Sequence, residues 1–100
     1  MMPRRILRIK RRYLEAVRAG RKSIEIRGYP LKPGKYLLQA GPYQLEVYIG
    51  EPSKISREDL KAYLEAACCT LEELDSLIGP RSYYFIHPIF ISSRVMQHGA

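Results

Sequence analysis

Polar and hydrophobic residues alternate along several short stretches of the chain, and a two-residue period of this kind predicts β-strands. In the segment 44–49, for example, Leu45, Val47 and Ile49 would lie on one side of a strand. Pro88 interrupts the last stretch and cannot donate a backbone hydrogen bond, so we expect an edge, a bulge or a corner there. The expected strands cover residues 6–9, 23–27, 35–40, 44–49 and 82–91.

Helical periodicity appears between the first two of these strands. Hydrophobic residues at helical spacing would form the buried face of a helix at residues 11–19, namely Tyr13, Leu14, Val17 and Ala16. Arginine and glutamate residues occupy the opposite face. Gly20 follows and can adopt the left-handed conformation that ends a helix.

Two further helices are expected after the fourth strand, because each has its own start signal. The Ser56 hydroxyl can cap the first of them. Thr70 and Glu73 have the spacing of a capping box, in which each side chain accepts a hydrogen bond from the backbone of the other. Gly79 and Pro80 would end this second helix.

The resulting order, β-α-β-β-β-α-α-β, favours an α+β fold over a parallel α/β sheet. We expect a small mixed or antiparallel β-barrel of about five to six strands with two to three short helices. One hundred residues suit a single domain, so its bounds would be residues 1–100. Residues from Ser92 onward have no strong pattern and are expected to be loosely held, which leaves His98 without a role.

Positive charge is concentrated in the first forty residues. Twelve Lys and Arg residues stand there against two Glu residues, a balance of +10, whereas residues 41–100 have a balance of −3. Arginine predominates in the basic half and suits bidentate contact with phosphates. This asymmetry indicates a surface that faces a polyanion, and nucleic acid is the commonest polyanion in a cell. Solubility alone is the simpler explanation, but it does not account for the clustering.

The cysteines and the hydropathy pattern indicate a cytoplasmic chain. Cys68 and Cys69 are adjacent, which suits neither a disulfide nor a zinc site, so we interpret them as small buried residues in a reducing compartment. No hydrophobic run is long enough to cross a bilayer, and the start lacks the apolar centre of a signal peptide. No metal-binding cluster or cofactor motif is present, so no cofactor is expected.

The segment 20–27, with the sequence Gly-Arg-Lys-Ser-Ile-Glu-Ile-Arg, is the strongest candidate for a functional site. In a strand, Ser23, Glu25 and Arg27 would share one face and the two isoleucines the other. Such a strand could form the floor of a polar cleft. It could equally be an edge strand with a solvated outer face.

Lys10, the helix after it and the Gly20–Arg27 segment together resemble the signature of ASCH domains, a family with a PUA-like β-barrel. The Pro33-Gly34 turn and the closing strand fit the same pattern over nearly the whole chain. The resemblance implies a cleft beside the barrel, floored by Glu25 and Arg27 and approached by Lys10 and Lys22. It also implies RNA or nucleotide binding, because most members are regarded as modules of that kind.

A subset of the family is enzymatic, including small acetylcytidine amidohydrolases and reported ribonucleases. Lys22 matches the lysine of those amidohydrolases, but Glu25 stands where they have a threonine nucleophile, and their distal Glu would fall near Glu65. Ser23 is a spare hydroxyl beside Lys22. Lys22 and Glu25 could instead act as acid and base in metal-free RNA cleavage, with Arg27 or Lys10 stabilising the phosphate.

Binding requires less of these residues than catalysis does. Arg27 and Lys10 would contact phosphate, Glu25 would accept a hydrogen bond from a base or ribose, and Tyr29 could stack on a base. The charged residues could also simply pair with one another. We therefore expect an RNA- or nucleotide-binding module, with hydrolysis of RNA or of a modified nucleoside as the alternative. A third class is an adaptor whose basic face binds an acidic protein partner. His87 is expected at the edge of the core.

Overall fold

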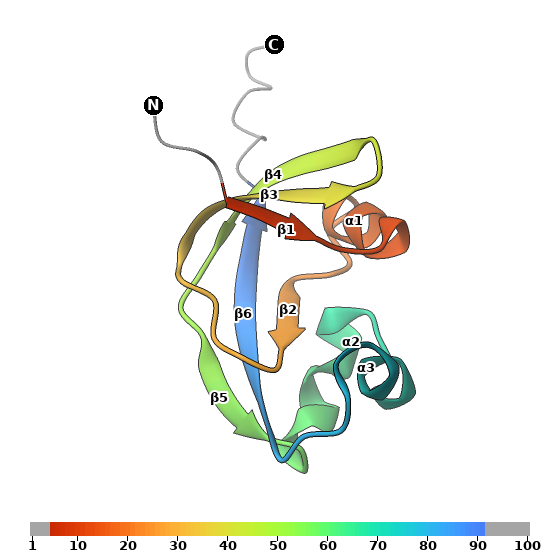
Figure 1. Ribbon diagram of the computed structural model, residues 1–100, viewed down its shortest axis with the longest axis vertical. Helices are drawn as coiled ribbons and strands as arrows, with labels where there is room; N and C mark the ends of the chain where they lie inside the picture. The colour runs from red at the N-terminus through yellow and green to blue at the C-terminus, as the bar shows by residue number, and fades with distance from the viewer. Residues whose placement is uncertain (1–4, 92–100) are drawn as a thin grey trace.

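The strand β6 (Tyr83–Ile91) runs through much of the length of the molecule and connects its two halves (Figure 1). The computed structural model describes residues 5–91, which contain six strands in one curled, half-barrel sheet. The other strands are β1 (Arg5–Arg8), β2 (Ile24–Arg27), β3 (Gly34–Ala40), β4 (Tyr43–Ile49) and β5 (Ser53–Ser56). The expected α+β class with a small barrel-like sheet is therefore confirmed.

The helices are short and lie beside the sheet. The first, α1 (Arg11–Arg18), packs on β3, β4 and β6 in one half of the molecule. The others cover the second half, near β2 and β5 (Figure 1). They are a 3₁₀ helix, η1 (Asp59–Tyr63), followed by α2 (Leu64–Ala67) and α3 (Leu71–Ile78).

The sheet has the order β1-β3-β4-β6-β2, with β5 also pairing β6. The β1–β3 pair is parallel, and the remaining pairs are antiparallel. β1 and β2 stand at opposite ends of this order and are not paired with each other. The half-barrel is therefore open between these two strands.

Pro88 lies where β6 changes partners. On one side of β6, β5 pairs as far as Ile86 and β4 pairs from Ile89 onward. Ile49 pairs with Ile89 of β6, and Ser53 pairs with Ile86. The chain between Ile49 and Ser53 is one residue longer than the chain between Ile86 and Ile89, and one extra residue on one side of a ladder defines a β-bulge. The missing N–H of Pro88 thus falls opposite this irregular point of the ladder, and of the edge, bulge or corner that was expected there a bulge is found.

The described residues 5–91 form two separate hydrophobic cores. The first lies between α1 and the strands β1, β3 and β4, and its fully buried centre is formed by Leu14, Val47 and Ile49. The second lies between β2, β6 and the later helices, around Leu60 and Tyr84. β6 contributes to both, because Tyr84 and Ile86 enter the second core and Ile89 enters the first.

Most local expectations match these elements to within one or two residues, but three details differ. β5 was not predicted from the sequence. Ser56 ends this strand, although its hydroxyl does accept a hydrogen bond from the Asp59 N–H at the start of η1. Cys68 and Cys69 are free and only half-buried rather than buried. The expectation for Ser92 and the residues beyond it lies outside the described part of the chain.

Candidate functional site

The Gly20–Arg27 segment joins the two halves of the molecule. Gly20 has a φ of 82° and ends α1 as expected, and the backbone N–H groups of Arg21 and Lys22 both donate to the Ala16 carbonyl. The Ser23 N–H then donates to the Ala66 carbonyl of α2, and its carbonyl accepts from the Ile89 N–H of β6. The segment is therefore tied to α1, α2 and β6 before β2 begins.

Lys22 is 5 % exposed, and its ammonium group is fully used inside the protein. Nζ donates to the Ala67 carbonyl at 2.8 Å and to the Ile24 carbonyl at 2.9 Å, and it lies 3.3 Å from Glu25 Oε1. An ammonium has three protons, and here three acceptors surround it. Two of them are main-chain carbonyls, one of which belongs to the last residue of α2, where a cation is favourable.

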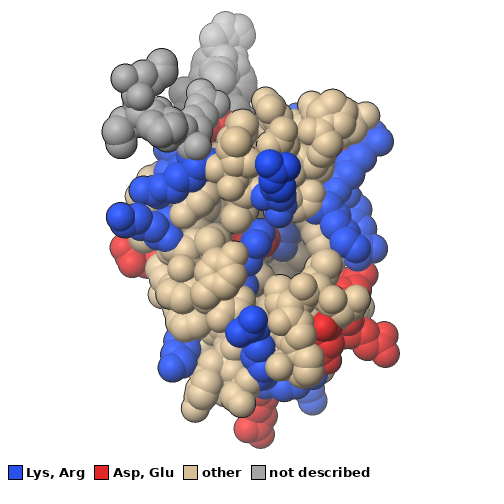
Figure 2. Space-filling model, in the orientation of Figure 1, with Lys and Arg blue, Asp and Glu red and all other residues tan. Residues whose placement is uncertain are grey.

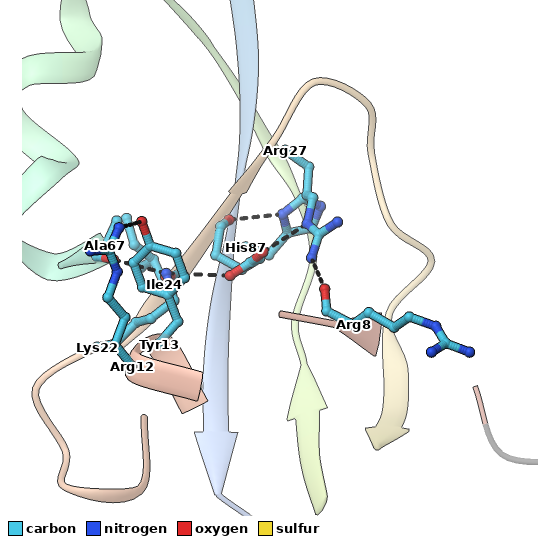
Figure 3. Close-up of polar contacts among 9 residues, drawn as sticks. Arg8, Arg12, Tyr13, Lys22, Ile24, Arg27, Ala67 and His87 are labelled. Atoms are coloured by element: carbon cyan, nitrogen blue, oxygen red, sulfur yellow. Dashed lines mark hydrogen bonds and ion pairs between the residues drawn. The ribbon is translucent and has the colours of Figure 1, made fainter. Parts of the chain in front are cut away.

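Glu25 is also buried, and each of its carboxylate oxygens contacts a different cation. Oε1 faces Lys22, and Oε2 accepts a hydrogen bond of 2.7 Å from Arg27 Nε. The Arg27 side chain is 18 % exposed, and its Nη2 reaches the Arg8 carbonyl at 3.5 Å. Arg27 thus bridges β2 and β1 across the open side of the half-barrel, whereas the Arg8 side chain points away from it (Figure 3).

His87 lies on β6 beside this cluster and is completely buried. The Leu31 N–H donates to Nε2 at 2.9 Å, so that nitrogen carries no proton, and Nδ1–H donates to the Glu25 carbonyl at 3.1 Å. Burial lowers the pKa of His87 below its usual range. The histidine is therefore a neutral core residue that positions the backbone of β2 and the 28–33 loop.

The expectation that β2 displays a polar face to a cleft is wrong for Glu25. Side chains of α1 and α3, including Tyr13 and Leu74, lie with Lys22 and Glu25 around one small cavity, so helices cover this side of the strand. Lys22, Glu25 and Arg27 do converge, but on one another. The pairing that the sequence left open as an alternative is the arrangement found for these three residues.

Four other candidate residues lie apart from the charged cluster. Lys10 is exposed immediately before α1, and its side chain makes no hydrogen bond or ion pair within residues 5–91. Tyr29 is exposed in the loop after β2, and Glu65 is exposed in the first turn of α2. Ser23 is exposed and borders a pocket of its own.

Cavities of very different size adjoin the segment. The cavity beside Lys22 and Glu25 measures about 40 Å³, which is room for water but not for a nucleoside. The second, which we call the Ser23 pocket, measures about 470 Å³ and falls in the range of ligand pockets. Its walls come from the end of α1, the start of the segment and the end of β6: Val17, Gly20, Lys22, Ser23, Ile89, Phe90 and Ile91.

Exposed cations surround α1. Figure 2 shows basic side chains along the α1 edge of the molecule and around a hollow in the middle of the face in view. We use the name α1 basic band for the exposed basic residues of α1 and its two flanks, which are Lys10, Arg11, Arg12, Arg18 and Arg21.

Only part of the α1 basic band is neutralised. Arg12 pairs with Glu73 at 2.7 Å, and Arg18 lies 3.8 Å from Glu15. Lys10, Arg11 and Arg21 have no carboxylate partner in the part of the chain that the structure describes, although the Arg11 guanidinium stacks on the ring of Tyr43 at 4.1 Å. The sequence predicted both the excess charge and arginines on the exposed face of this helix, but it placed the candidate site on β2 rather than around α1.

Within the described residues 5–91, no helix is long and apolar enough to cross a membrane, and no three His, Cys, Asp or Glu side chains are grouped to hold a metal ion. Comparison with protein-family models, with curated proteins and with solved structures gives no match to this chain.

Proposed function

We propose that this domain binds single-stranded RNA, with the phosphates on the α1 basic band and one nucleotide in the Ser23 pocket. The observation that carries the proposal is the position of the pocket. It begins at Gly20 and Ser23, immediately after α1, so the unpaired Arg21 stands next to a cavity of nucleotide size, and Lys10 and Arg11 lie at the other end of the same helix. Exposed Arg and Lys side chains that lack carboxylate partners are available to displace counterions from a nucleic acid backbone.

The pocket offers both kinds of contact that a nucleotide requires. Val17, Ile89 and Ile91 form apolar walls, and the exposed Phe90 stands at the rim. The Ser23 hydroxyl can donate to or accept from a base edge or a ribose hydroxyl. A free nucleotide is the smallest ligand that would satisfy the same contacts, which agrees with the resemblance of the segment to the ASCH signature. We place this activity in the cytoplasm, where the free Cys68 and Cys69 would stay reduced.

Hydrolysis by Lys22 and Glu25 has less support. A general acid or base must reach the proton that it transfers, whereas the Lys22 ammonium is saturated by three internal acceptors. Glu25 holds a cation on each oxygen, and the adjoining cavity does not admit a nucleoside. Glu65 makes no side-chain hydrogen bond or ion pair with the described residues and does not complete a catalytic group.

The test is the salt dependence of binding to a short single-stranded oligoribonucleotide, measured by fluorescence anisotropy. For single strands each phosphate contact contributes about −0.7 to the slope of log K against log salt. The triple variant Lys10→Gln, Arg11→Gln, Arg21→Gln should weaken binding and reduce the magnitude of that slope by about 2. Binding that is independent of salt would refute the proposal.

A matched control removes exposed positive charge elsewhere. Lys54 and Lys61 lie on β5 and η1, in the other half of the molecule. The double variant Lys54→Gln, Lys61→Gln should bind with the original slope. If it weakens RNA binding as much per charge as the triple variant does, the attraction is a property of net charge and not of the α1 basic band.

A further inference from the structure

Three side chains form a row across the outer face of the sheet. In the antiparallel register Lys35 of β3 lies opposite Tyr48 of β4, and Tyr48 lies opposite Phe90 of β6. Their neighbours in sequence, such as Tyr36, Val47 and Ile89, point the other way and are buried in the first core. The row therefore faces away from α1, on the side of the sheet that no described helix covers.

The two aromatic rings of this row are unusually open to solvent. Tyr48 is 44 % exposed and Phe90 is 56 % exposed, although the two residues are paired with each other near the ends of β4 and β6. Directly opposed residues on neighbouring strands have Cβ atoms about 4.5–5.5 Å apart, so the rings form adjacent surfaces. The positions of β4 and β6 that face the first core beside these rings are instead occupied by Val47, Ile49 and Ile89.

We propose that Tyr48 and Phe90 are a stacking platform for two successive unpaired bases of the bound RNA, with Lys35 contacting a phosphate beside them. The inference rests on the proposed function and extends it, because it names the surface that recognises the strand and what it recognises there: two successive bases that are free to stack. Aromatic side chains on an open sheet suit this ligand, since every base has a π-face.

The platform is continuous with the Ser23 pocket. Phe90 belongs to both, because it lines the pocket and also stands in the row with Tyr48. A strand whose phosphates follow the α1 basic band would reach the pocket at Gly20 and could continue over Phe90 to Tyr48. The two sites thus lie on one path at the end of β6.

Charge favours RNA over an apolar protein segment as the occupant. The row ends in the exposed Lys35, and its opposite end adjoins the pocket beside the basic band. Glu46 is the one acidic residue in β1, β3, β4 and β6, and it is half-buried and engaged in a contact of its own. An interface between copies of this chain would bring these positive surfaces together.

The experiment compares two short fluorescein-labelled oligoadenylates, one intact and one with abasic sites, for binding by anisotropy. Tyr48→Leu and Phe90→Leu should each weaken binding of the intact strand about 5-fold or more, because stacking contributes about 1–3 kcal/mol per base. Neither change should alter binding of the abasic strand. Tyr48→Phe and Phe90→Tyr keep an aromatic ring and should bind as the original protein does.

Tyr83→Leu is the matched control. Tyr83 is 54 % exposed at the other end of β6, outside the row, so its loss should leave both affinities unchanged. One outcome is that the original protein binds RNA with the expected salt slope while Tyr48→Leu and Phe90→Leu, like Tyr83→Leu, leave both affinities unchanged. That result would refute the platform alone. Absence of binding by the original protein overturns both proposals.

Sedimentation velocity tests the competing occupant. If Tyr48→Leu and Phe90→Leu dissociate a dimer and leave RNA affinity unchanged, the row is an interface between copies and the platform is refuted. If all variants sediment as the original protein does and the leucine variants lose affinity for the intact strand alone, the rings act on bases.

Discussion

Glu25 is the shared counterion of the buried charged cluster at the centre of the molecule. It is buried, and it faces the ammonium of Lys22 and the guanidinium of Arg27 at the same time. Buried ion pairs add little to stability when compared with a hydrophobic replacement of both partners. Removing one partner, however, leaves the other charge buried without a counterion. The cluster is therefore sensitive to loss of the carboxylate.

Glu25→Ala should destabilise the domain by about 3–5 kcal/mol, because Lys22 and Arg27 would lose their shared counterion. Urea denaturation followed by circular dichroism measures the change. Glu51→Ala removes an exposed carboxylate from the loop between β4 and β5 and should alter the free energy of unfolding by no more than about 0.5 kcal/mol. Equal stability of the two variants would contradict the structural role of Glu25.

His87 gives the domain a stability that depends on pH. Its pKa is lowered in the folded protein, chiefly by burial, while in the unfolded chain it titrates near about 6.5. As the pH falls below that value, the unfolded chain binds a proton that the folded protein does not accept. The stabilisation is therefore complete above about pH 6.5 and is lost toward lower pH, by at most about 1.4 kcal/mol per pH unit.

The measurement is urea unfolding at pH 7.5 and at pH 5.0, two conditions on either side of the free imidazole pKa of about 6.5. His87→Gln serves as the comparison, since a glutamine can accept from the Leu31 N–H and donate to the Glu25 carbonyl without titrating. The original protein should lose more stability between the two conditions than the variant. The same pH dependence in both would show that His87 is not the source.

At the scale of the elements, local chemistry accounts for what could be predicted. The Thr70–Glu73 capping box, the end of α1 at Gly20 and the alternation of Leu45 with Val47 each depend on residues a few positions apart, and all three are found. β5 was missed because Ser53–Ser56 is short and only half-buried, so its pattern is weak.

The environment of β2 could not be predicted from its own residues. The pattern Ser-Ile-Glu-Ile-Arg is the same whether the polar face meets water or a helix, and the outcome is decided by segments more than forty residues away. The Ala67 carbonyl of α2 and the side chains of α3 cover that face. The Ser23 pocket likewise depends on Phe90, which no local signal connects with Gly20.

The cap of α3 provides a test at this scale. Thr70 Oγ1 accepts from the Glu73 N–H at 3.1 Å, and Glu73 Oε1 accepts from the Thr70 N–H at 2.9 Å. Thr70→Ala should cost about 1 kcal/mol in urea denaturation. Thr70→Ser retains the hydroxyl and should cost much less; a loss equal to that of the alanine variant would show that the threonine methyl group, not the cap, is responsible.

For the molecule as a whole, the polar cluster lies between the two hydrophobic cores. On β6, His87 separates Ile86 of the second core from Ile89 of the first. Lys22 comes from the end of the α1 half, and its ammonium bonds the last residue of α2. The proposed RNA surface belongs mainly to the first core and its α1 basic band, whereas α3 carries the acidic residues Glu72, Glu73 and Asp75. Glu73 neutralises Arg12 where α3 meets the band, so a polyanion would be directed to the cations of the band that remain unpaired.

Lys22→Met tests whether the two cores, which the cluster separates, can open independently of each other. The methionine matches the length of the lysine but leaves the Ile24 and Ala67 carbonyls without their donor and Glu25 with Arg27 alone. Because an unsatisfied buried acceptor costs about 1–3 kcal/mol, α2 and its neighbours should open more easily. In native-state hydrogen exchange, amides of α2 and α3 should exchange faster, while those of β3 and β4 keep their rates. Equal acceleration in both cores would mean that the domain opens as one unit and that the cluster does not separate them.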